Sequence, residues 1–155
     1  MWQLRVPSKV KTFVWRACTN LLPTMVNLVK RKVGFSPIYS CKRELENTLH
    51  VLWGCENIKF VWCKDFCELN VENHPLDSFV DLSSLTLSNP KGAKLFAMIC
   101  WSLWTRRNKT RVGGSTRPLP KVFGTIGQHL KNFNSYKLSV RKNLALARLC
   151  ESHLI

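Results

Sequence analysis

NPKGAKLFAMICWSLWTRRNKTR, residues 89–111, is the stretch that most strongly predicts the fold. Asn89 and Pro90 supply a helix start signal. The apolar side chains that follow recur at helical spacing and line one side of a helix: Leu95, Phe96, Ile99, Cys100, Leu103 and Trp104. Four cations end the stretch: Arg106, Arg107, Lys109 and Arg111. We therefore expect a core helix whose carboxyl end is basic.

Shorter helices are predicted upstream of this segment. The apolar pattern indicates a helix over residues 9–20 capped by Ser8, and a second helix that Thr24 caps and Gly34 stops. Residues 35–47 have the composition of a loop. Further helical patterns occupy residues 48–53 and 57–69, with a weak turn at 76–82. No alternating strand pattern occurs, so the predicted fold class is all-α, a small irregular helical bundle.

The domain organisation follows from one break in composition. The segment GGSTRPLP, residues 113–120, has the composition of a linker. We therefore expect a helical domain over residues 1–112 and a basic amphipathic helical tail over residues 121–155.

Charge is large and unevenly distributed. The 155-residue chain has 24 Lys and Arg against 9 Asp and Glu, a formal net charge of +15. Residues 1–43 and 82–150 contain no carboxylate, whereas residues 44–81 hold eight of the nine. Such basic blocks favour polyanions, because each phosphate contact releases condensed counterions. RNA or DNA is the partner that the charge indicates; a solvated basic face without a ligand is the alternative.

The cysteines and the first residues indicate a compartment. No apolar run is long enough to span a bilayer, and the first residues lack the features of a secretory signal. Seven cysteines are an odd number without framework spacing, which argues against a disulfide scaffold. We expect an intracellular protein in a reducing compartment, nucleus or cytoplasm, whose cysteines are metal ligands or buried thiols. The sequence sets no oligomeric state.

Cys41, His50 and Cys55 have the spacing of a metal site. Zinc takes four ligands in a tetrahedron, commonly a close cysteine pair on a turn plus a His and a Cys presented by a helix. His50 and Cys55 are the helical half, provided that the helix ends just before Cys55 so that it folds back toward the imidazole. A two-residue gap before Cys41 leads to Ile38 instead of a second thiol, so three ligands remain.

Three groups of residues, taken in order, carry a family resemblance. WQLRVPSKVKTFVWRA (2–17), LPTMVNL (22–28) and the pair Arg31 and Lys32 resemble the opening of the reverse-transcriptase zinc-binding domain of plant LINE-type retrotransposons. Residues 41–62 resemble the metal segment of the same family. WSLWTRRN, residues 101–108, is similar to the connector that follows this domain in such polyproteins.

This resemblance implies a zinc site made by a cysteine pair, a histidine and a last cysteine. Matched position by position, Cys41 is the second member of the pair, His50 the histidine and Cys55 the last cysteine, and Ile38 replaces the first cysteine. The nearby candidates to replace it are Cys63, Cys67 and His74. Zinc is the expected cofactor, in a loop-borne, degenerate zinc-knuckle segment on an all-α bundle.

Several aromatic and thiol side chains have a structural interpretation beside a functional one. Five tryptophans could stack on bases, but their place on hydrophobic stripes favours anchoring in the core: Trp15, Trp53, Trp62, Trp101 and Trp104. Cys18 and Cys100 lie on apolar helix faces, which is typical of buried thiols.

No enzyme is expected, because the carboxylates are confined to predicted loop and surface helix and no phosphate-cradling Gly-rich loop occurs. The leading hypothesis is a non-catalytic nucleic-acid-binding accessory module of retroelement origin. Its phosphate contacts are expected from ten cations: Lys9, Lys11, Arg16, Lys30, Arg31, Lys32, Arg106, Arg107, Lys109 and Arg111. The alternative is a scaffold or protein-interaction remnant of a truncated retrotransposon polyprotein with no metal bound.

Overall fold

The computed structural model describes residues 4–34, 36–38, 41–62, 66, 76–87, 90–116, 118–119, 121 and 126. Its helices are α1 (Ser8–Cys18), α2 (Met25–Lys30), η1 (His50–Gly54), η2 (Glu56–Ile58), α3 (Lys59–Trp62), α4 (Phe79–Leu87) and α5 (Pro90–Arg111). These described parts contain no strand or sheet, only an isolated antiparallel bridge between Ile38 and Leu45. The prediction of an all-α fold is confirmed.

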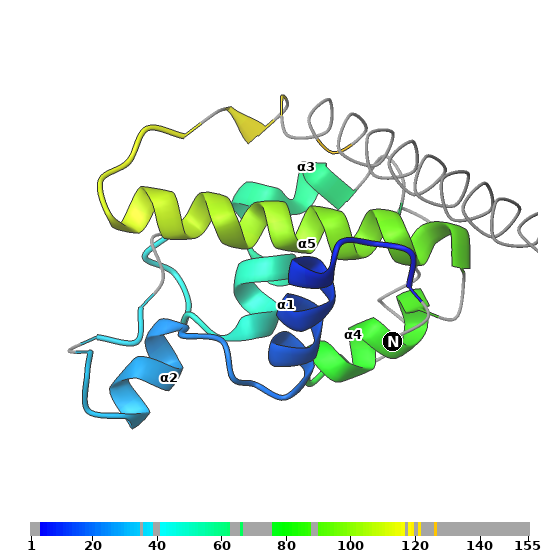
Figure 1. The fold of residues 1–155 in the computed structure, drawn as a ribbon. Helices are drawn as coiled ribbons and strands as arrows, with labels where there is room; N and C mark the ends of the chain where they lie inside the picture. The colour runs from blue at the N-terminus through cyan, green and yellow to red at the C-terminus, as the bar shows by residue number, and fades with distance from the viewer. Residues whose placement is uncertain are drawn as a thin grey trace, which may run out of the picture.

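Helix α5 is the element around which the others pack (Figure 1). The Phe13 ring of α1 lies 6.4 Å from that of Trp104, and the Trp62 ring of α3 lies 5.5 Å from that of Phe96. All five residues from Phe96 to Cys100 are buried. The sequence predicted an apolar stripe on one side, but α5 is covered on more than one side because α1 and α3 both contact it.

An aromatic cluster fills the centre of the core. The Phe96 ring lies within 6.0 Å of the rings of Phe66 and Phe79, and the Trp62 ring lies 5.5 Å from that of Phe66. Such pairs contribute about 0.5–1.5 kcal/mol each beyond the burial of their surface. The core therefore depends on contacts between α3, α4 and α5.

Helix α1 begins and ends close to the predicted residues, but its cap differs. Ser8 is the first helical residue and Pro7 occupies the N-cap position without a side-chain hydrogen bond, so the prediction of Ser8 as the cap is wrong. Pro7 fixes the backbone at the entry, and its carbonyl accepts from Val10 N–H at 2.9 Å. At the other end Asn20 has a φ of 53°, and Leu21 N–H donates to the Arg16 carbonyl at 2.7 Å. This left-handed turn stops the helix.

Helix α2 has the predicted cap and an unexpected end. The Thr24 side chain accepts a hydrogen bond from Asn27 N–H at 3.3 Å, as a capping threonine does. The predicted stop was Gly34, yet the helix ends at Lys30. Lys32, with a φ of 58°, adopts the left-handed conformation, and Val33 N–H donates to the Leu28 carbonyl at 2.9 Å. A lysine thus fills the position that glycine usually takes.

Helix α4 is longer than the weak turn predicted at residues 76–82. Ser78 N–H donates to the Asp81 carboxylate at 2.9 Å, and Asp81 N–H donates to Ser78 Oγ at 3.3 Å. This reciprocal pair is a capping box, which satisfies two amide donors at the start of a helix. It explains why the helix begins here and extends to Leu87.

The predicted domain boundaries fall mostly on residues outside this description. Residues 113–116 are described and are not helical, whereas the predicted tail over 121–155 is described only at Lys121 and Ile126. Cys63, Cys67 and His74 also lie outside the described residues. Among the helices that are described, none is both long and apolar enough to cross a bilayer.

Candidate metal centre

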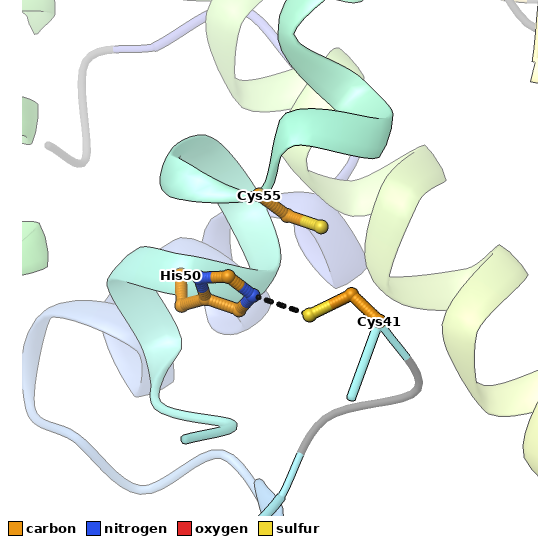
Figure 2. A group of neighbouring side chains, drawn as sticks. All are labelled: Cys41, His50 and Cys55. Carbon is orange, nitrogen blue, oxygen red and sulfur yellow. Dashed lines mark hydrogen bonds between the residues drawn. The ribbon is translucent and has the colours of Figure 1, made fainter. Parts of the chain in front are cut away.

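Cys41, His50 and Cys55 come together in the structure (Figure 2). Their ligand atoms all lie within 4.8 Å of one another, and Cys41 Sγ is 3.3 Å from His50 Nε2. His50 and Cys55 are buried, and Cys41 is half-buried. The loop and the helical half of the predicted site therefore face one another.

The chemistry and separation of these donors fit zinc. Tetrahedral zinc holds two thiolates about 3.8 Å apart, and a thiolate and an imidazole nitrogen about 3.5 Å apart. The three ligand atoms lie at or within 4.8 Å, so small side-chain movements bring them to these distances. Two sulfurs and one imidazole nitrogen are also the donor types that zinc selects.

Local hydrogen bonds place His50 and Cys55. The Asn47 side chain accepts from His50 N–H at 2.7 Å and so caps the helical stretch that begins at Thr48. The chain then winds as a π-helix from His50 to Gly54, and Cys55 N–H donates to the His50 carbonyl at 3.0 Å. The helix ends just before Cys55, as the spacing predicted. The wide turn returns Cys55 to the imidazole.

Glu44 lies beside the histidine. Its Oε2 is 2.8 Å from His50 Nδ1, an ion-pair distance, while Nε2 faces Cys41. In metal-binding histidines, a carboxylate near the second ring nitrogen favours one tautomer and one direction of the ring. Sequence reasoning missed this role, although a carboxylate three residues after the first ligand, in the same turn, was the available signal.

The two cysteines have different acidities. Burial raises the pKa of the Cys41 thiol, but hydrogen bonds from the backbone N–H groups of Arg43 and Glu44, and from Cys55, bring that pKa below its usual value. The pKa of Cys55 is raised, chiefly by burial and then by the neighbouring Cys41. Cys41 is therefore the first of the pair to offer a thiolate to a cation.

Glu46 ties the metal segment to both flanking helices. Its carboxylate accepts from Met25 N–H at 2.9 Å and from the Arg107 guanidinium of α5, and its carbonyl accepts from Val26 N–H at 3.2 Å. The side chains of Glu46 and Arg107 are 4% and 5% exposed. Arg107 was predicted to contact phosphate; the structure places its guanidinium against Glu46 and away from the outer surface.

The other predicted phosphate contacts lie on three helices and the turn after α2. Seven are exposed: Lys9, Arg16, Lys30, Arg31, Lys32, Lys109 and Arg111. Lys11 and Arg106 are half-buried. Lys9 Nζ lies 4.6 Å from the centre of the Trp101 ring, so its charge rests partly on an aromatic face.

The tryptophans and lone thiols mostly behave as expected of core residues. Trp62 and Trp104 are buried, and Trp53 and Trp101 are half-buried. Trp15 differs, because 42% of it is exposed on α1. Cys100 is fully buried, and Cys18 is half-buried with Sγ 3.5 Å from Ser83 Oγ: both are packing thiols.

Ile38 stands at the sequence position where the resemblance implies the first cysteine. It pairs with Leu45 across the metal loop and is 53% exposed, so the hairpin-like loop forms without a thiol there. Within the described residues, the fold and the site define a helical domain that presents three zinc-type donors from one loop and one helix end.

The comparisons with known proteins agree with this class. Residues 1–62 match the family model described as zinc-binding in reverse transcriptase, which confirms the resemblance carried by the motifs. The chain is also 26% identical over 129 residues to an Arabidopsis thaliana protein provisionally named a ribonuclease H protein. That alignment covers 79% of this chain and 21% of the relative, so the chain spans about a fifth of the relative's length. No solved structure gives a significant match.

Proposed function

We propose that this chain is a non-catalytic accessory module of retroelement origin that binds RNA or DNA through phosphate contacts and carries a structural zinc ion. The zinc ligands proposed are Cys41, His50 and Cys55. When bound, the metal would supply a rigid link between the loop at Cys41 and the helix end at Cys55. Because thiolate ligands persist under reducing conditions, we propose that the protein acts in a reducing compartment, nucleus or cytoplasm.

The observation that carries the proposal is that Glu46 and Glu44, the carboxylates of the metal segment, each have a partner of their own. Glu46 is buried against Arg107, and Glu44 contacts His50. Exposed cations near these positions in the sequence are therefore not neutralised by either carboxylate: Lys30, Arg31, Lys32, Lys42 and Arg43. An uncompensated basic surface attracts phosphate backbones without reading base sequence.

The two carboxylate-free stretches, residues 1–43 and 82–150, would each supply cations to this surface. Figure 1 shows the carboxyl end of α5, which carries Lys109 and Arg111, on the same side of the view as α2 and the loop that follows it. Glu46 joins these parts, because it contacts both Met25 at the start of α2 and Arg107 in α5. A nucleic-acid partner also agrees with the name of the Arabidopsis thaliana relative.

Salt-dependent binding tests this proposal. A labelled RNA and a labelled DNA are titrated with the whole chain at several ionic strengths. The double variant Arg31→Gln, Lys32→Gln should reduce the slope of log K against log salt by about 1.8 for duplex DNA and about 1.4 for a single strand. Lys59→Gln with Lys94→Gln removes the same charge from other elements and should change the slope less.

Two outcomes would contradict the proposal. Absence of binding at every ionic strength would remove the nucleic-acid partner. Unchanged binding after neutralising Arg31 and Lys32 would favour the alternative of a protein-interaction scaffold. Metal analysis of protein purified without chelator, with Cys55→Ser as the control, tests the zinc ion separately.

A further inference from the structure

We propose that a metal ion held by Cys41, His50 and Cys55 keeps its fourth coordination position open, and that this position binds a small oxyanion from an adjoining cavity. The inference rests on the zinc site of the proposed function. It adds a ligand class, phosphate or a carboxylate, that the three protein donors do not supply.

The donor set of the described residues stops at three. No fourth His, Cys, Asp or Glu in the described part of the chain joins the group. Ile38 has no donor atom at the position where the related domains have a cysteine. Glu44 does not substitute for it, since its carboxylate contacts Nδ1 of His50 while Nε2 faces Cys41. Zinc with three protein ligands completes its tetrahedron with an exogenous ligand.

A cavity borders the site on the α5 side. Its volume is about 170 Å³. Its polar lining is Cys41, Asn57, Arg106, Arg107 and Thr110, and its apolar lining is Val51, Ile58, Leu103 and Leu119. One water needs roughly 10–15 Å³ of such space, so the cavity has room for several waters or one small oxyanion. Cys41 is the one proposed metal ligand that lines the cavity, so the inference requires the open position to face the cavity from the Cys41 side.

The lining has the charge and the donors that an anion needs. Arg107 is 5% exposed, and its Nε has no hydrogen-bond partner among the described residues. Its Nη2 contacts Glu46, which balances its charge, and Arg106 adds a second guanidinium to the wall. Two thiolates already neutralise a divalent metal. The charge of Arg106 and the Nε donor of Arg107 are therefore what would favour an anion over water.

Cobalt(II) substitution of the whole 155-residue chain tests the open position. The d–d absorption of tetrahedral cobalt should change and saturate when inorganic phosphate or acetate is added. In Ile38→Cys, which adds a third thiol as the fourth donor, the response should disappear and zinc affinity should rise at least about tenfold. An unresponsive wild-type spectrum would overturn the inference.

Two matched variants test the cavity. Arg106→Gln should weaken phosphate binding to the cobalt protein by about tenfold, through loss of one charge-assisted hydrogen bond. Lys109→Gln removes the same charge from an exposed residue of the same helix and should leave phosphate binding within about twofold. Equal effects of both variants would show non-specific screening and would overturn the assignment of the cavity.

X-ray absorption of the zinc protein separates the remaining outcomes. Three protein donors plus one light exogenous atom support the inference. Four protein donors, with Cys63, Cys67 or His74 as the extra ligand, overturn it and leave the proposed zinc site intact. A chain that binds neither zinc nor cobalt overturns the inference and the proposed zinc site together.

Discussion

The core around α5 and the metal segment over residues 41–55 are held by different kinds of interaction. In the core, buried apolar side chains from α1, α3, α4 and α5 contact one another, and no single polar contact decides the arrangement. In the metal segment, a few polar side chains define the path of the chain, chiefly Glu46, Asn47 and His50. The helical bundle should therefore persist without zinc, whereas the donor geometry depends on single residues.

The largest expected effect is in the core. Phe96→Ala removes a fully buried ring that contacts the rings of Trp62, Phe66 and Phe79, and should lower the free energy of unfolding by about 3–5 kcal/mol. Urea denaturation followed by circular dichroism measures this change. Phe60→Ala, at a ring that is 47% exposed, is the control and should cost far less. Equal costs would mean that the core is not where stability resides.

The contact that joins the two regions gives the next effect. Glu46→Ala leaves the Arg107 guanidinium buried without its carboxylate and should cost about 3 kcal/mol. The same denaturation measurement applies, with Glu56→Ala as a matched ion-pair control. Glu56 and Lys59 are both 60% exposed, so breaking their pair should have a small effect on stability. If Glu46→Ala lowered the free energy of unfolding no more than the control, Glu46 would not be what joins the metal segment to α5.

Glu44 should affect the metal and not the bundle. Glu44→Gln weakens the contact that orients His50 and should reduce zinc affinity by about tenfold. Competition with a chromophoric zinc chelator measures the affinity. The unfolding midpoint of the metal-free protein should stay unchanged, because Glu44 is 66% exposed. If Glu44→Gln shifted the unfolding midpoint and left zinc affinity unchanged, Glu44 would stabilise the bundle and not the metal site.

The stability of the core should depend on pH through the buried thiol of Cys100. Burial raises the pKa of Cys100 well above the ordinary value of 9.0. The folded state then keeps the proton that the unfolded state releases, so this stability is present below pH 9.0 and is lost as pH rises. The metal-free wild type should lose roughly 0.8 kcal/mol more than Cys100→Ala between pH 8 and pH 9.5. Parallel pH profiles of the two proteins would contradict this.

Much of the helical fold could be predicted because its signals are local. The apolar pattern that begins at Pro90 runs through one continuous helix, and Thr24 caps α2 as expected. The grouping of Cys41, His50 and Cys55 also followed from spacing, since one loop and one helix end carry all three. By contrast, Ser78 and Asp81 form a capping box whose sequence signature was overlooked, which left α4 too short.

The remaining features depend on contacts between distant parts of the chain. Arg107 looks like the other cations of its helix, and only its position opposite Glu46, 61 residues earlier, makes it a buried partner. Trp15 has the spacing of a core residue, yet no element covers it fully. Periodicity assigns a side chain to a helix face, but it does not reveal which faces the tertiary fold covers.

The π-helical turn between His50 and Cys55 explains why this spacing works. In a regular α-helix, residues five apart point about 140° away from each other, so they could not grip one ion. An added residue would carry one donor further around the helix, whereas the loss of one residue would give an i, i+4 pair, which a regular α-helix already places on one face. The four residues between the histidine and the cysteine therefore go together with the π-helical winding. In a related sequence with a different number of residues there, we expect a different backbone winding.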